Sequence, residues 1–321
     1  MIQDRLNEWT MELADGAEIQ SVNEHVEHLA EELYVEYEPT KGPYPDFWQR
    51  LESWLDNVSE MEQKVLFKSL KHLFFIGDRE LDNLYRVAYN EAVPMWLMDI
   101  LGLRLDDTNL SSRLVDGLRS TWFCPLTDSM RINAFYHLNH VSGFNHRPDW
   151  SSLCELGSDA KIDKYMTDEG IERIVLLEDF VGSGSQIEDA VRYAASLPRG
   201  RPVLVVPLVL CPIGIPLLDS MVTTYSNLKY KAILRLHRFD FLGSAPVTNE
   251  PSLYASLRTI ATTAYNQIQK SGPHNQLYGP FGFADTGGLV VLSTNCPDNA
   301  LPYLHFNCAT WNALFPRASR L

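Results

Sequence analysis

The chain has 321 residues, which is long for one domain and sufficient for two, and its formal net charge of −14 is unevenly spread. Residues 1–120 carry 24 acidic and 11 basic side chains, whereas the rest of the chain carries 17 and 16. Because an acidic surface repels nucleic acid and anionic lipid, we predict neither direct nucleic-acid binding nor membrane association. The five cysteines form no C-x-x-C pair, which argues against a disulfide framework or a zinc ribbon. The charged N-terminal segment lacks the apolar core of a signal peptide, so we expect a cytoplasmic protein.

The first third of the chain predicts helices. Ser21 and Glu24 have the spacing of a capping box, and apolar residues recur behind them at helical spacing as far as Leu33. The same periodicity predicts three more helices, over residues 47–55, 60–75 and 78–101, the last of them kinked near Pro94. With the shift in charge, these elements predict a helical N-terminal domain over residues 1–115, whose acidic surface is a candidate for docking protein partners.

Strands and helices alternate after residue 120. Apolar, β-branched runs predict strands over residues 174–177, 203–210, 229–236 and 289–292. Helical periodicity predicts helices between them, over residues 187–197, 213–224 and 253–270. Strands separated by helix-length segments indicate a mostly parallel sheet that is covered on both faces. We therefore predict an α/β fold, in which a doubly wound domain over residues 116–321 follows the helical domain.

Residues 174–186 carry the most specific pattern, Ile-Val-Leu-Leu-Glu-Asp-Phe-Val-Gly-Ser-Gly-Ser-Gln. A buried strand is followed by two carboxylates, Glu178 and Asp179, and then by a loop of glycines and serines before the next helix. Gly182 and Gly184 allow the backbone to adopt a positive φ and to approach a ligand closely, and the amides of a helix N-terminus favour phosphate. Acids would repel a bare phosphate, but they suit a sugar phosphate, whose hydroxyls donate to carboxylates. The segment therefore predicts a sugar-phosphate site.

This segment resembles the phosphoribosyl-pyrophosphate (PRPP) signature of type I phosphoribosyltransferases. That signature is a hydrophobic strand, an acidic pair, two apolar residues and a loop similar to Thr-Thr-Gly-Gly-Thr. The resemblance implies that Glu178 and Asp179 hold the ribose hydroxyls and that Mg²⁺ accompanies PRPP or a nucleotide. It also implies that the 5-phosphate is bound by the loop, which consists of Gly182, Ser183, Gly184, Ser185 and Gln186.

The sequence departs from the family pattern at three positions of this loop. Gln186 and Ser185 replace the final Thr and the second Gly of the signature. Gly182 stands where 6-oxopurine transferases carry an aspartate, so we do not expect hypoxanthine or guanine salvage. The candidate pyrophosphate loop is Cys124–Arg131, in which Arg131 would meet pyrophosphate, and residues 139–160 are the candidate mobile loop.

A second, looser resemblance spans most of the chain. It is to phosphoribosyltransferase-like proteins that are encoded beside bacterial anti-phage systems, including some retrons. These proteins carry an aspartate after a short strand, as Asp128 does in Pro125–Ser129, and an Asn-x-Pro-x-Asn-x-x-Pro stretch, here Asn295–Pro302. The resemblance implies an effector of a defence system that acts at the anomeric carbon of PRPP or a nucleotide.

Plainer interpretations stay open. Residues 174–186 are also compatible with a strand-to-helix turn whose acids cap the helix. Asn295–Pro302 is compatible with a turn held by Asn side chains, and the pair Asp128 and Arg131 is compatible with a surface turn. Three histidines share a short stretch in which a structural role is more common than metal ligation, namely His137, His140 and His146. The main alternative to an enzyme is a non-catalytic module that senses PRPP or a nucleotide on the same fold.

Overall fold

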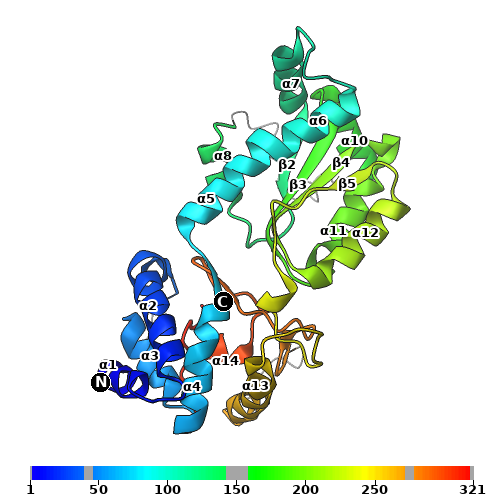
Figure 1. Cartoon of the computed structure of the whole chain (residues 1–321). Helices are drawn as coiled ribbons and strands as arrows, with labels where there is room; N and C mark the ends of the chain where they lie inside the picture. The colour runs from blue at the N-terminus through cyan, green and yellow to red at the C-terminus, as the bar shows by residue number, and fades with distance from the viewer. Residues whose placement is uncertain (1, 40–45, 142–157, 272–277, 319–321) are drawn as a thin grey trace. The chain divides into compact units, whose positions relative to one another are not determined.

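The computed structural model describes residues 2–39, 46–141, 158–271 and 278–318. The chain divides into two compact units, whose elements are labelled in Figure 1. Residues 1–78 and 237–321 form the first unit, and residues 79–236 form the second. The second unit is therefore one continuous segment inserted between the two halves of the first.

This division differs from the boundary after residue 115 that the sequence predicted. The predicted helical domain is split, because the helices that follow Asp78 pack on the α/β sheet. The predicted α/β domain is split as well, because residues 237–321 share a hydrophobic core with the N-terminal helices. The charge shift near residue 120 marks a change in surface composition, which is independent of where the chain passes from one core to another.

The first unit is mainly helical. Its helices are α1 (Ile2–Thr10), α2 (Gly16–Glu32), α3 (Phe47–Leu55), α4 (Glu60–Ser69), α13 (Leu253–Gln269) and α14 (Pro302–His305), with short 3-10 turns at Tyr34–Glu36, Leu70–His72 and Arg238–Asp240. Its strands are β1 (Phe74–Ile76) in parallel with β9 (Val290–Leu292), and β7 (Tyr278–Gly279) antiparallel to β8 (Gly282–Phe283). Aromatic residues from both halves of the chain meet in its core, among them Trp54, Tyr303 and Phe315.

The start of α2 corrects the capping-box prediction. The helix begins at Gly16 and not at Ser21, so Ser21 lies in its interior. Buried Ile19 extends the apolar stripe toward the N-terminus. A side chain at position 16 would collide with the preceding turn, because a Cβ there would lie 2.2 Å from the backbone oxygen of Thr10. Glycine at this position therefore lets α1 and α2 approach each other.

The helix predicted over residues 60–75 is too long at its C-terminal end. α4 ends at Ser69, and Phe74–Ile76 is a strand instead. The late strand predicted at residues 289–292 is confirmed as β9, but its partner is β1 and not the α/β sheet. The pairing joins segments that are far apart in the chain, and no local pattern in the sequence reports it.

The second unit is built on a parallel sheet. β2 (Thr121–Pro125), β3 (Arg173–Val181), β4 (Val203–Leu210) and β5 (Leu228–Tyr230) lie in that order, and β6 (Leu234–Arg235) pairs with the C-terminal end of β4. Its helices are α5 (Asp78–Val87), α6 (Val93–Leu101), α7 (Leu110–Arg119), α8 (Ile132–Leu138), α10 (Asp159–Asp168), α11 (Ser185–Ala195) and α12 (Ile215–Thr224). The predicted α/β class and the mostly parallel sheet are confirmed.

Helices cover both faces of this sheet. Along β3, Ile174 and Leu176 belong to the core formed with α10, α11 and α12. Val175 and Leu177 belong to the core formed with α5, α6 and α8. Figure 1 shows α5 and α6 on one side of the strands and α11 and α12 on the other. Because both faces are buried, the strands read as unbroken apolar runs in the sequence.

The helix predicted over residues 78–101 is interrupted near Pro94, as the sequence indicated. A π-helical turn, Ala88–Ala92, joins α5 to α6, and Pro94 lies in the first turn of α6. A proline ring clashes with the carbonyl group four residues earlier and offers no N–H, so a wider turn accommodates Pro94 without ending the helix.

Two further predictions bear on the described residues. No helix among them is both long and apolar enough to cross a membrane. The four cysteines that the structure describes are free thiols.

Candidate functional site

The acidic pair lies at the carboxyl edge of the parallel sheet. β3 runs to Val181, beyond the predicted end of the strand, so Glu178 and Asp179 are part of the strand itself. The loop of residues 126–131 leaves β2 at the same edge, where the Leu126 N–H donates to the Leu177 carbonyl at 2.8 Å. Ligands of open α/β sheets bind at this edge. The two segments predicted to bind a phosphoribosyl compound thus leave neighbouring strands.

Glu178 is 2% exposed and binds the loop after β2. Its Oε2 accepts the Thr127 N–H at 3.0 Å, and its Oε1 accepts the hydroxyls of Thr127 at 2.6 Å and of Ser129 at 3.2 Å. Burial raises the pKa of Glu178 to about 8, and the charge of Asp179 acts in the same direction. The Glu178 carboxyl accepts three hydrogen bonds from the loop after β2, so it connects this loop to β3.

Asp179 is the more exposed acid of the pair. Its Oδ1 accepts the Ser129 hydroxyl at 3.0 Å and the Phe180 N–H at 2.8 Å. Ser129 therefore contacts both acids and fixes their positions relative to the loop. Since Glu178 is enclosed by Thr127 and Ser129, Asp179 is the carboxylate better placed to meet a ligand.

A short loop, residues 182–184, joins β3 to α11. Gly184 is the N-cap residue of α11 with a φ of 85°, and a Cβ there would lie 2.7 Å from Leu217 Cδ2. Glycine satisfies both constraints, whereas any other residue meets strain. Gly182 does not share the positive φ. Gly184 has no side chain that could cap α11. The Ile187 N–H donates to the Gly184 carbonyl at 3.1 Å, so the Ser185 and Gln186 amides are the candidates for binding an anion in this turn.

The segment after β4 supports this loop. The Cys211 N–H donates to the Val181 carbonyl at 2.9 Å, and Gly214 lies against Gly182. A Cβ at position 214 would lie 2.5 Å from the Gly182 carbonyl oxygen. A 3-10 turn, Pro212–Gly214, therefore packs closely against one side of the loop.

The polar side chains of the loop are near the surface. Ser183 is half-buried, whereas Ser185 and Gln186 are exposed. The hydroxyls of Ser183 and Ser185 are 3.1 Å apart, and Ser183 Oγ is 3.5 Å from the Ser185 amide nitrogen. These contacts are local and partly long, so both hydroxyls can turn toward phosphate oxygens.

Asp128 and Arg131 lie in the loop between β2 and α8, and both are exposed. Arg131 is the N-cap residue of α8. They follow the strand next to the acidic pair, and their assignment to the site remains a prediction. Sequence analysis missed Thr127 and Ser129, which flank Asp128 and bind the acids. Hydroxyls on either side of a candidate site aspartate were the available signal.

Asn295–Pro302 belongs to the first unit, whereas the α/β sheet belongs to the second. Asn295 Oδ1 accepts the Ala318 N–H at 3.2 Å. Asn299 Nδ2 donates to the Thr286 hydroxyl at 3.0 Å. These amides hold neighbouring chain segments in place, which supports the plainer interpretation of a turn held by Asn side chains.

The described residues contain no group of three or more His, Cys, Asp or Glu side chains that could hold a metal ion. His137 lies in α8 and His140 two residues beyond its end. His146 and residues 142–157 of the predicted mobile loop lie outside the described part of the chain. Asp179 nevertheless suits Mg²⁺, because Mg²⁺ commonly takes one or two carboxylates and fills its other positions with phosphate oxygens and water.

A protein-family model described as PRTase-CE matches residues 51–317 of the chain. The matched segment includes the whole second unit and most of the first. Comparison with curated proteins and with solved structures gives no match.

Proposed function

Because this chain belongs to the PRTase-CE family and has a phosphoribosyltransferase-like fold, we propose that it binds PRPP or a nucleotide and acts at the anomeric carbon of its ribose. One observation carries the proposal: the N-terminus of α11 follows, after the short loop 182–184, a strand that carries an acidic pair near its carboxyl end. Amides attract the phosphate and a carboxylate accepts the sugar hydroxyls, so the two ends of a sugar phosphate find matching groups.

In this proposal the 5-phosphate binds the backbone amides of residues 183–186 and the Ser183 and Ser185 hydroxyls. Asp179 accepts the hydrogen bonds of the ribose hydroxyls. Glu178 acts mainly as a positioning residue, because its carboxyl is buried and bonded to Thr127 and Ser129. Asp128 and Arg131 lie on the loop that Glu178 holds, and there they meet the leaving group.

The proposed reaction breaks the bond between C1 of the ribose and its leaving group, which departs with the electron pair. For PRPP the leaving group is pyrophosphate. A nucleophile forms the new bond to C1 and releases its proton, and the transition state resembles an oxocarbenium ion. Asp179 stabilises the positive charge of the sugar, and Arg131 the negative charge of the pyrophosphate. Mg²⁺, bound with PRPP, would neutralise the pyrophosphate charge further.

Calorimetry with PRPP and Mg²⁺, together with a pyrophosphate-release assay, tests the proposal. We expect Asp179→Asn to weaken PRPP binding roughly tenfold or more, since it removes a charge-assisted acceptor. Asp189→Asn is the matched control, because Asp189 is an exposed carboxylate within α11. Equal PRPP binding by the two variants, or no binding of PRPP or nucleotides by the wild type, would overturn it.

A non-catalytic sensing module is the second candidate, and the state of Glu178 favours it. A buried carboxyl that is bonded to Thr127 and Ser129 is less available to substrate than the resemblance implied. Binding of PRPP without release of pyrophosphate would identify this function.

We place the activity in bacterial anti-phage defence, in line with the looser sequence resemblance. The acidic helices of the first unit are then candidates for docking partner proteins. A phage-challenge assay of the complete defence operon tests this context. If the operon still protects cells from phage when it carries Asp179→Asn, the proposed site is not required for defence.

A further inference from the structure

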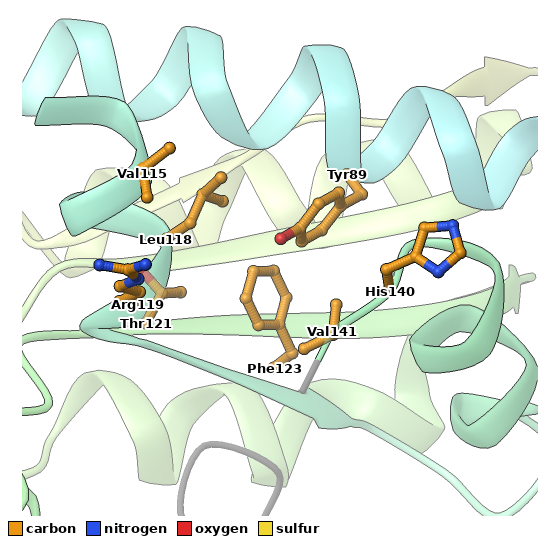
Figure 2. A pocket seen from close by; sticks show the side chains of 8 residues that line it. All are labelled: Tyr89, Val115, Leu118, Arg119, Thr121, Phe123, His140 and Val141. Carbon is orange, nitrogen blue, oxygen red and sulfur yellow. The ribbon is translucent and has the colours of Figure 1, made fainter. Parts of the chain in front are cut away.

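A cavity of about 210 Å³ opens beside the N-terminal end of β2, in the second unit. It lies at the start of the strand, whereas the candidate phosphoribosyl site lies at the carboxyl edge of the sheet. Figure 2 shows six of the side chains that carry the argument, namely Tyr89, Leu118, Arg119, Phe123, His140 and Val141. They come from the π-helical turn, α7, β2 and the segment after α8, so four separate parts of the chain build the cavity.

Two aromatic residues that pack against each other are among those that line this cavity. The rings of Tyr89 and Phe123 have centroids 5.6 Å apart at an interplanar angle of 48°. Phe123 is 1% exposed and fixed in the sheet. Tyr89 belongs to the π-helical turn, and such turns occur frequently at functional sites. Its hydroxyl points toward the space between Leu118 and Phe123 (Figure 2).

A guanidinium group and an imidazole ring lie at the two ends of the cavity. Arg119 lies at one end and His140 at the other (Figure 2). Among the described residues, no carboxylate lines the cavity, although the protein has a net charge of −14. Within the described parts of the chain, Arg119 forms an ion pair with Asp116 at 3.9 Å, and both side chains are about three-quarters exposed, at 78% and 74%. Such a long, exposed pair leaves the guanidinium able to bind another anion.

The volume limits what the cavity can hold. An apolar protein cavity of about 150 Å³ binds benzene, so the larger space here fits one aromatic ring with a small substituent. Aromatic and aliphatic walls favour a flat ring, and Arg119 favours an acidic substituent. We infer that this cavity binds a small aromatic carboxylate. The inference does not depend on the proposed phosphoribosyl site.

Fluorine NMR of 4-fluorobenzoate, titrated with the full-length protein, tests the inference. We expect the resonance to broaden or shift with the wild type, and we expect the neutral 4-fluorobenzamide to bind several-fold more weakly. Equal binding of the two probes would overturn the inference, as would the absence of any effect of the wild type at millimolar 4-fluorobenzoate.

Matched variants locate the site. Arg119→Gln should weaken 4-fluorobenzoate roughly threefold, the size expected for an exposed charge pair. Arg104→Gln should leave it unchanged, because Arg104 is 77% exposed, is also paired with an aspartate and lies away from the cavity lining. Tyr89→Leu should weaken binding roughly tenfold while keeping an apolar side chain in the π-helical turn. Thermal unfolding confirms that each variant is folded, and equal responses of Arg119→Gln and Arg104→Gln would contradict the assignment.

Discussion

Residues 182–186 and 295–302 are both rich in turn-forming residues, and sequence analysis named both as candidate functional loops. The structure treats their polar groups differently. In 295–302 the side-chain amides are used within the protein, and Asp298 pairs with Arg317. In 182–186 no side chain caps α11, and the serine hydroxyls contact only each other and a nearby amide. A loop whose polar groups are already satisfied supports the fold, whereas one whose amides are open can bind a ligand.

The largest effect is expected at Glu178, which lies in β3 shortly before the loop of residues 182–186. The pKa of Glu178 is raised from its ordinary value of 4.5 to about 8, so the folded protein keeps a proton that the unfolded chain loses. This contribution to stability is complete below pH 4.5 and is lost as the pH rises toward 8. We expect wild type to lose about 2–5 kcal/mol relative to Glu178→Gln between pH 4.5 and pH 8.5. Urea unfolding of both proteins across this range measures it, and parallel curves would refute a protonated Glu178.

The second prediction concerns a side chain introduced into the loop of residues 182–186. Gly184→Ala places a Cβ at a φ of 85° and 2.7 Å from Leu217 Cδ2. We expect a loss of about 1–3 kcal/mol in unfolding free energy, and roughly tenfold weaker PRPP binding because the amides are displaced. Gly279→Ala is the control, since a Cβ there meets nothing within 4 Å. Unfolding and calorimetry report the two effects, and equal behaviour of the two variants would show that the loop tolerates a side chain.

The third prediction concerns residues 295–302, whose side-chain amides form hydrogen bonds within the protein. Asn299→Ala removes the hydrogen bond to Thr286, at a position that is 9% exposed. We expect the unfolding free energy to fall by about 1–2 kcal/mol with no change in PRPP affinity. Chemical unfolding and calorimetry on the same preparation separate the two. A loss of PRPP affinity at unchanged stability would instead indicate that Asn295–Pro302 takes part in ligand binding.

The smallest effect is expected at Ser183, in the loop of residues 182–186. Ser183→Ala removes one hydroxyl from the proposed phosphate contact and leaves the backbone amides in place. We expect PRPP to bind about three- to fivefold more weakly, with stability changed by less than about 0.5 kcal/mol. Calorimetry measures the affinity. Unchanged affinity would assign the phosphate to the amides alone.

Much of the α/β unit could be predicted from the sequence because its signals are local. The apolar runs of β3 and β4 and the Gly-Ser segment before α11 each report their own structure. The pairing of β1 with β9 could not be predicted, since it joins residues separated by most of the chain. Local patterns also hid the bonds from Thr127 and Ser129 to Glu178, which depend on β2 and β3 being neighbours. For the same reason, the sequence presented the two acids as equivalent, although their burial differs.

The interrupted first unit has a consequence for how the protein is made. Because β1 pairs with β9, that unit lacks a partner strand until the ribosome has translated beyond residue 292. Residues 79–236 emerge as a complete segment long before that point, and domains generally fold as units during synthesis. The N-terminal helices must therefore wait with apolar surface uncovered while the α/β sheet assembles, which makes chaperone capture of the nascent chain most valuable in this interval.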